Sequence, residues 1–237
     1  MIIQKFLINH IPAILCGDES QKAFLFIHGK DGCKEDAAGF AETAIQAGWQ
    51  VLGIDLPEHG ERKSGSVQML PWNVVPELQS VIAYAKQHWN KIGVSANSIG
   101  AWFGMLSFAG EPIQKCLFVS PILDMEKLIH NMMLWEQVSE EQLEREGQIQ
   151  TAFGETLSWE YLSYVRSHPI TNWNAPTSIL YAGHDHVTDR ATVDNFVKRH
   201  HAKLTVMENG EHWFHTPEQL AFLKQWTVTE LIFAANR

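Results

Sequence analysis

The stretch IGVSANSIG, residues 92–100, decides the fold. Its first six residues predict a strand, and Ser98 follows in the pattern small-x-Ser-x-Gly, with Ala96 before it and Gly100 after it. Small residues at these two positions suit a sharp turn from a strand into a helix, because such a turn leaves almost no room beside the serine. The turn would raise the Ser98 hydroxyl above a sheet and aim the Ile99 N–H at whatever the hydroxyl attacks. The pentapeptide alone also fits a helix whose N-cap is Ser98, since serine is a favoured N-cap residue.

Short apolar runs alternate with longer amphipathic segments on both sides of this stretch. Residues 2–8 and 11–16 predict a β-hairpin at the start of the chain. The further elements are strands at 23–29, 50–56, 92–97, 115–121, 177–183 and 203–209, and helices at 35–47, 73–90, 99–109, 190–201 and 217–235. Strands that alternate with helices are typical of a mostly parallel sheet covered by helices on both faces. The predicted fold class is therefore α/β.

One segment, residues 122–168, interrupts the alternation of strands and helices. It contains helical patches at 125–129, 139–149 and 157–166 and no strand-like run. We therefore expect a helical insertion here, lying over the edge of the sheet. The chain has the length of a single domain, residues 1–237, with the insertion at about 122–168.

The composition narrows the class of protein further. The chain carries 18 Lys and Arg against 27 Asp and Glu, a formal net charge of −9, which argues against a nucleic-acid-binding face and against docking on anionic membranes. No run of 18 apolar residues occurs, so we expect no membrane span, and the N-terminus lacks the features of a signal peptide. The three cysteines, Cys16, Cys33 and Cys116, form no CxxC pair, which argues against a zinc ribbon and suits a reducing, cytoplasmic location.

A serine nucleophile needs a base to take its proton and an acid to orient that base. In a mostly parallel sheet these groups follow later strands, in the order Ser, Asp or Glu, His. Asp185 follows the predicted strand 177–183, and His212 follows the strand 203–209. Because the carboxyl ends of parallel strands meet at one edge of the sheet, we expect Ser98, Asp185 and His212 to converge there.

Two other carboxylates compete with Asp185 for the role of acid. Asp124 follows the strand 115–121, and Asp189 lies shortly after Asp185. Each also precedes an amphipathic stretch, where aspartate is a favoured N-cap. Asp124 and Asp189 therefore remain alternatives, with helix capping as the ordinary structural role of each.

Five short motifs, in this order along the chain, resemble those of the α/β-hydrolase superfamily. They are His28-Gly29, Asp55-x-Pro57-x-His59-Gly60, the turn around Ser98, Gly183-x-Asp185-x-Val187 and Gly210-x-His212. The resemblance covers about residues 20–235 and is nearest to small bacterial esterase- and lipase-like members, some of which hydrolyse thioesters or peptides. It implies an eight-stranded type of sheet, a Ser98–His212–Asp185 catalytic triad and a cap at 122–168. Ala96 departs from the glycine that the superfamily usually has two residues before the serine.

The resemblance also implies an oxyanion hole made of two backbone N–H groups. One belongs to Ile99, directly after the serine, and the other to Lys30, directly after the His-Gly pair. We interpret His28 as a buried structural histidine that packs the oxyanion loop, and His59 as part of a turn.

Four apolar side chains supply a candidate substrate pocket: Met132, Met133, Trp135 and Trp213. Methionine and tryptophan form adaptable surfaces for acyl or aromatic groups. The alternative is that such residues form the core of the insertion. None of the twelve histidines lies in a zinc spacing such as HExxH, so we expect no metal, and the absence of a nucleotide-binding loop leads us to expect no cofactor.

Together these motifs predict a serine hydrolase that cleaves a small carboxylic ester or thioester through an acyl-enzyme intermediate. One alternative is a serine peptidase of the same fold, in which the acidic run Glu140, Glu141, Glu144 and Glu146 binds a substrate amine. The other alternative is a non-catalytic protein that binds a small ligand and retains the fold. Covalent labelling by a fluorophosphonate distinguishes a catalyst, which reacts at Ser98, from a binding protein.

Overall fold

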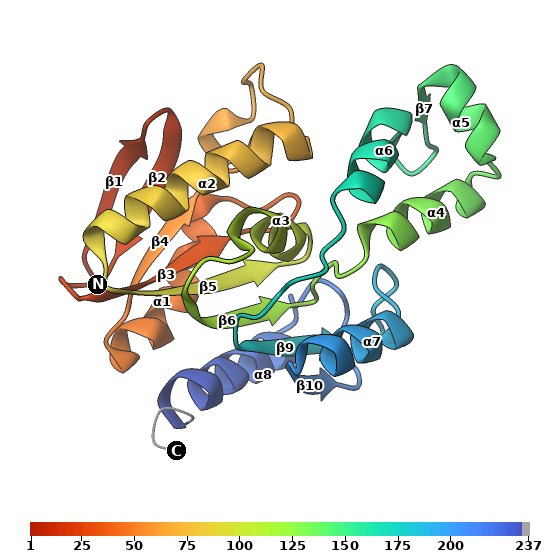
Figure 1. Ribbon diagram of the computed structural model, residues 1–237. Helices are drawn as coiled ribbons and strands as arrows, with labels where there is room; N and C mark the ends of the chain where they lie inside the picture. Colours follow the sequence, from red (N-terminus) through yellow and green to blue (C-terminus); the bar gives the residue numbers. More distant parts are fainter. Residues whose placement is uncertain (234–237) are drawn as a thin grey trace.

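Strands from distant parts of the sequence assemble into one eight-stranded sheet in the computed structural model, which describes residues 1–233 (Figure 1). The order across the sheet is β1-β2-β4-β3-β5-β6-β9-β10. These strands are β1 (Ile3–Ile8), β2 (Ile11–Cys16), β3 (Lys22–Ile27), β4 (Gln50–Ile54), β5 (Lys91–Asn97), β6 (Ile113–Val119), β9 (Thr177–Ala182) and β10 (Lys203–Met207). β1 pairs with β2, and β2 with β4, in antiparallel fashion, and the other pairs of this sheet are parallel. The predicted mostly parallel α/β sheet is confirmed.

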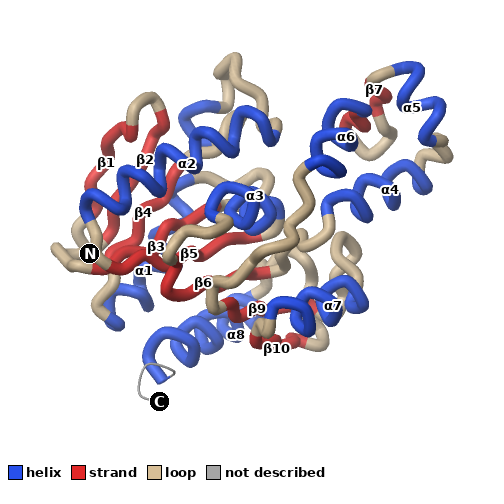
Figure 2. The backbone as a smooth tube through the Cα atoms, in the orientation of Figure 1, coloured by secondary structure: helices blue, strands red, loops and turns tan. Residues whose placement is uncertain are grey.

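Helices cover both faces of the sheet, as the tube in Figure 2 shows. These helices are α1 (Ala37–Ala44), α2 (Pro71–His88), α3 (Ile99–Phe108), α7 (Arg190–His200) and α8 (Pro217–Val228). The helices α4 (Met125–Trp135), α5 (Glu140–Glu146) and α6 (Trp159–Ser167) lie beyond the sheet, between β6 and β9. Short helical turns are η1 (Lys34–Asp36), η2 (Ile45–Ala47), η3 (Gly60–Arg62) and the π-helical η4 (Thr229–Phe233). The side chains of α2, α3 and α7 pack on one face, and those of α1 and α8 pack on the other.

The side chains of β3 show how the sheet is buried on both faces. Leu25 and Ile27 belong to the hydrophobic core shared with α2 and α3, whereas Phe24 and Phe26 belong to the core shared with α1 and α8. Successive residues of a strand point to opposite faces, so a strand between two helical layers must be apolar throughout. This requirement explains the continuous apolar run in this part of the sequence.

The predicted and observed element boundaries differ mainly where a strand enters a functional loop. The predicted strand 23–29 ends at Ile27, because the next two residues already belong to the turn beside Ser98. The predicted helix 217–235 is α8 followed by η4, and positions 234–235 of that prediction lie outside the described residues.

The segment between β6 and β9 holds α4, α5, α6 and a two-stranded antiparallel ribbon, β7 (Gln148–Gln150) with β8 (Thr156–Ser158). The expectation that 122–168 contains no strand is therefore wrong. Each of these strands has only three residues, too few for a periodic pattern, and Gly147 (φ +75°) turns the chain from α5 into β7. We call residues 125–167, from α4 to α6, the inserted segment; it lies beyond the carboxyl ends of β5 and β6 (green to teal in Figure 1).

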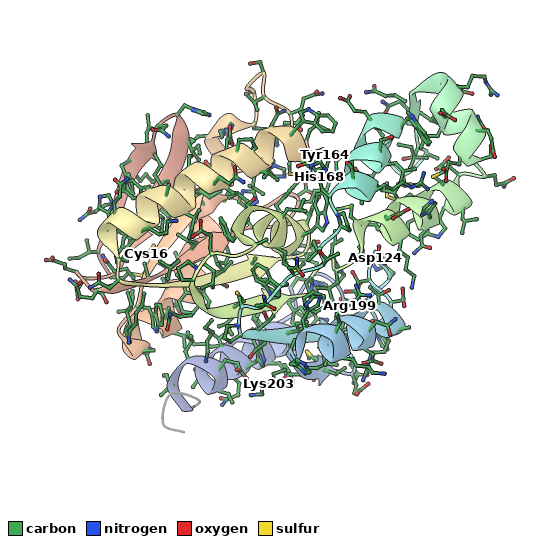
Figure 3. The ribbon with its side chains drawn as sticks, in the orientation of Figure 1. Cys16, Asp124, Tyr164, His168, Arg199 and Lys203 are labelled. Carbon is green, nitrogen blue, oxygen red and sulfur yellow. The ribbon has the colours of Figure 1, made fainter. Side chains whose placement is uncertain are left out.

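Aromatic side chains attach the inserted segment to the helices of the sheet. Tyr161 of α6 stacks on Trp102 of α3, with ring centroids 5.9 Å apart. The ring of Trp72, in α2, lies 6.3 Å from the Tyr161 ring and 5.8 Å from the Tyr164 ring (Figure 3 labels Tyr164). Each such pair contributes about 0.5–1.5 kcal/mol beyond the area it buries. Nowhere in residues 1–233 is a helix both long and apolar enough to cross a membrane.

Candidate active site

Ser98 occupies a strained turn between β5 and α3. Its backbone has φ +49° and ψ −120°, a conformation that residues other than glycine rarely adopt. A Cβ at Gly100 would come within 2.4 Å of the His28 carbonyl oxygen, and Ala96 is fully buried, so both positions need small residues. The Ser98 side chain makes no capping hydrogen bond to α3. The N-cap alternative for this side chain is therefore not what the structure shows.

The three side chains predicted to converge form a continuous hydrogen-bonded relay. The Ser98 Oγ lies 2.9 Å from His212 Nε2, and His212 Nδ1 lies 2.8 Å from Asp185 Oδ2. The other Asp185 oxygen accepts the Val187 and Thr188 backbone N–H groups at 2.8 and 3.0 Å. A carboxylate only accepts, so His212 carries its proton on Nδ1 and leaves Nε2 free to take the Ser98 proton.

The two competing carboxylates have other partners. Asp124 caps α4 by accepting the Lys127 N–H at 2.9 Å (Figure 3 labels Asp124). Asp189 caps α7 by accepting the Thr192 N–H at 3.0 Å and pairs with Lys127 at 2.6 Å. Burial acts to raise the pKa of Asp189, but the hydrogen bonds from Lys127 and Thr192 outweigh it and lower the pKa to about 2. The structure brings Asp185, and neither alternative, to His212.

Two backbone N–H groups beside Ser98 are available for an oxyanion. A Cβ at Gly29 would lie 3.2 Å from the Ser98 Cβ, so the turn that begins there rests directly against the serine. Within residues 1–233, the N–H groups of Lys30 and Ile99 donate to no protein acceptor, whereas the next N–H, that of Asp31, is bonded to a side chain. Both N–H groups are therefore free to donate to a bound ligand.

His28 and a buried ion pair support this turn from below. His28 is fully buried; its Nδ1–H donates to the Gly29 oxygen at 2.7 Å, and its Nε2 accepts the Leu56 N–H at 3.0 Å. Burial lowers the pKa of His28, which keeps the ring neutral for these two bonds. The structure gives His28 the packing position that we expected.

Sequence reasoning missed the ion pair of Lys34 with Asp55, which are 2% and 0% exposed. Asp55 accepts the Lys34 ammonium at 2.9 Å, the Lys34 N–H at 2.8 Å and the Glu61 N–H at 3.0 Å. Burial acts to lower the pKa of Lys34, but the hydrogen bonds to Asp55 and Glu61 reverse the effect and raise it. Only the motif around Asp55 hinted at such a role, since Lys34 looks like an ordinary surface lysine in the sequence.

The four predicted pocket residues are not brought together. Met133 is buried, and Met132 packs against the same core. Trp135 and Trp213 are 55% and 74% exposed and have different neighbours: Trp135 meets Phe153 edge to face, and Trp213 stacks on His215. The methionines therefore fit the core alternative, and the two tryptophans lie at the surface.

Another unpredicted contact joins the inserted segment to the turn that carries Lys30. The Lys30 ammonium pairs with the carboxylate of Glu155, in the turn between β7 and β8. Both side chains are about half exposed. In the part of the chain that the structure describes, no three His, Cys, Asp or Glu side chains gather as metal ligands.

Solved structures share this architecture. Est1E from Butyrivibrio proteoclasticus, solved with ferulic acid bound, is 18% identical, with 99% of this chain and 100% of that chain covered and a TM-score of 0.79. Alpha/beta hydrolase domain-containing protein 10 from mouse is 12% identical, with 99% and 100% covered and a TM-score of 0.78. The thioesterase domain from the curacin biosynthetic pathway is 16% identical, with 97% and 99% covered and a TM-score of 0.58.

These likenesses establish the fold: the chain has the α/β-hydrolase fold, as its motifs predicted. No protein-family model and no curated protein sequence matches the chain.

Proposed function

We propose that the protein is a serine hydrolase that cleaves a small carboxylic ester or thioester through an acyl-enzyme intermediate. The observation that carries this proposal is the unbroken relay of Ser98, His212 and Asp185, with contacts of 2.9 and 2.8 Å. The relay lies at the carboxyl edge of the sheet, where open α/β sheets bind ligands. The ferulic acid in Est1E and the thioesterase activity named for the curacin domain support an ester or thioester as substrate class.

The proposed reaction has two steps that use the same side chains. Ser98 Oγ attacks the carbonyl carbon while His212 Nε2 takes its proton, and Asp185, whose side chain is buried, stabilises the imidazolium that forms. The Lys30 and Ile99 N–H groups bind the oxyanion, and His212 returns the proton to the leaving alcohol or thiol. Water, deprotonated by His212, then attacks the acyl-enzyme; the bond between the acyl group and Ser98 Oγ breaks, His212 returns the proton to Ser98 Oγ, and the acid is released. Loss of a single oxyanion donor typically costs ~10²–10³ in turnover.

The inserted segment serves as a cap over this site in the proposal. Its attachment through Tyr161 to Trp102, in the helix that begins after Ser98, supports this role. The ion pair between Lys30 and Glu155 adds a second connection. It lies at the turn of residues 29–32 that carries Lys30, which we call the oxyanion turn.

The peptidase alternative has less support in the arrangement of the acidic run. Glu140 is bonded to Arg166 at 2.6 Å and also faces His130. The hydrogen bond from Arg166 lowers the pKa of Glu140 to about 2. Glu146 pairs with Arg145 at 3.3 Å. These carboxylates are already occupied by cations of the inserted segment itself.

Activity-based labelling tests the proposal most directly. A fluorophosphonate is expected to modify the wild-type protein at Ser98, identified by peptide mass, and to leave Ser98→Ala unlabelled. In parallel, a panel of p-nitrophenyl esters and acyl-CoA thioesters measures turnover. A wild-type protein that is folded, unlabelled and inactive on every member of the panel would overturn the proposal in favour of a binding function.

A further inference from the structure

We propose that His59 is a positioning residue for the oxyanion hole, an inference that rests on the proposed hydrolase function. The histidine lies in the loop after β4, in a motif that the reaction itself does not use. Its imidazole holds the turn that carries Lys30, so that the Lys30 N–H stays aimed at the position of the oxyanion.

The oxyanion turn needs a hydrogen bond from outside the turn to keep its conformation. Asp31 has φ +63°, in the left-handed region that residues with a Cβ adopt at a cost. The turn closes on itself only through the Gly32 N–H, which donates to the Gly29 oxygen at a long 3.2 Å. The Asp31 N–H donates instead to His59 Nε2 at 3.0 Å. This bond fixes the peptide directly after Lys30 and therefore the orientation of the free donor before it.

The ring of His59 is itself held in one state. It is 9% exposed, and its Nδ1–H donates to the Pro57 oxygen at 2.8 Å, which leaves Nε2 as an acceptor. The ring centroids of His59 and its neighbour His28 lie 5.1 Å apart, and each histidine bonds to the loop from which the other comes. His28 comes from the oxyanion loop and accepts the Leu56 N–H, whereas His59 comes from the loop of Leu56 and accepts the N–H of Asp31. The two imidazoles thus cross-link the two loops.

The two loops stay attached when His59 is changed. Asp55 binds the ammonium and N–H of Lys34 on one side and the Glu61 N–H on the other, independently of either imidazole. We therefore expect a substitution at His59 to remove the hydrogen bond to the Asp31 N–H while the two loops remain joined through Asp55. This separation distinguishes a positioning role from a general role in folding.

Two amide substitutions at His59 each preserve a different one of its two hydrogen bonds. His59→Gln carries an oxygen where Nε2 stands and can still accept the Asp31 N–H. His59→Asn carries its amide where Nδ1 stands, so it retains the Pro57 contact and loses the contact to Asp31. His88→Asn is the matched control, because His88 has the same type of Nδ1 contact, to the Tyr84 oxygen at 2.8 Å, on the exposed surface of α2.

The test measures kcat and KM on the best p-nitrophenyl ester, together with hydrogen exchange of the Asp31 and Gly32 amides by NMR. For His59→Asn we expect kcat to fall about tenfold to a hundredfold with KM within about threefold, and exchange of the Asp31 amide to accelerate. His59→Gln should retain most of the activity and the slow exchange, and His88→Asn should match the wild type.

The outcomes separate this inference from the proposed function. An active wild type with His59→Asn and His59→Gln equal in kcat overturns the positioning role and leaves the hydrolase assignment intact. An inactive wild type overturns the assignment, whereas the exchange data still decide whether His59 holds Asp31. If the Asp31 amide exchanges as slowly in His59→Asn as in the wild type, His59 does not restrain Asp31.

Discussion

Substitution of Asp185 by asparagine keeps His212 in the site but changes which of its ring nitrogens carries the proton. The structure dictates how the new amide must sit. Val187 and Thr188 point two N–H donors at Oδ1, so the asparagine oxygen must occupy that position and its NH₂ group must face His212 Nδ1. The opposite orientation would place the NH₂ group against two donors and lose two hydrogen bonds of about 1 kcal/mol each. His212 is then driven to carry its proton on Nε2, where it cannot accept the proton of Ser98.

The expected loss in kcat is roughly 10⁴, the size that a wrong imidazole tautomer produces in a triad. KM and the midpoint of thermal unfolding should change little, because the asparagine retains both backbone bonds. Asp124→Asn is the matched control: asparagine is as good an N-cap as aspartate, so α4 keeps its capping bond and kcat should stay near that of the wild type. Both variants are assayed on the same p-nitrophenyl ester, with circular dichroism to verify folding.

An Asp185→Asn variant that retains more than about a tenth of wild-type kcat would refute the assignment of Asp185 as the acid. A large loss in Asp124→Asn alone would refute it too, because the acid would then follow β6. A large loss in both variants, with unfolding at a lower temperature, would indicate damage to the sheet edge and refute the assignment of a specific tautomer effect to Asp185.

Three further predictions address the nucleophile, the turn and the buried histidine. Ser98→Ala should lose up to ~10⁶ in turnover and remain folded; residual activity above a few per cent would rule out Ser98 as the nucleophile. Gly100→Ala should destabilise the protein by about 1–3 kcal/mol, because the new Cβ meets the His28 carbonyl oxygen at 2.4 Å, and a wild-type urea midpoint would contradict this. Burial lowers the pKa of His28 below its ordinary value of 6.5, so the unfolded chain takes up that proton first and stability falls as pH falls below about 6.5. The urea midpoint should therefore drop between pH 7.5 and 5.5, and an equal drop in His28→Gln would assign the effect elsewhere.

The sequence predicts those parts of the site that follow strand ends. Ser98, Asp185 and His212 each lie in the loop after an apolar strand, and the parallel arrangement of β5, β9 and β10 in one sheet then brings them to one edge. Local patterns suffice here, because the strand length and the turn determine where each side chain lies.

The unpredicted contacts join segments whose spacing no local pattern encodes. Lys34 pairs with Asp55 of another loop, and Lys30 pairs with Glu155, which lies 125 positions away in the sequence. The ribbon of β7 and β8 is too short for a hydrophobic period. Apolar composition likewise could not separate the buried Met133 from the exposed Trp213, since both suit a core or a pocket.

Lys30 belongs to two modules of the protein at once. Its backbone lies in the turn beside Ser98, while its ammonium pairs with Glu155 of the inserted segment. An inserted segment grafted from another protein of this fold, with an uncharged residue at the position of Glu155, would leave that ammonium without its partner. In a chimera of this protein, residue 30 should therefore be exchanged together with the inserted segment.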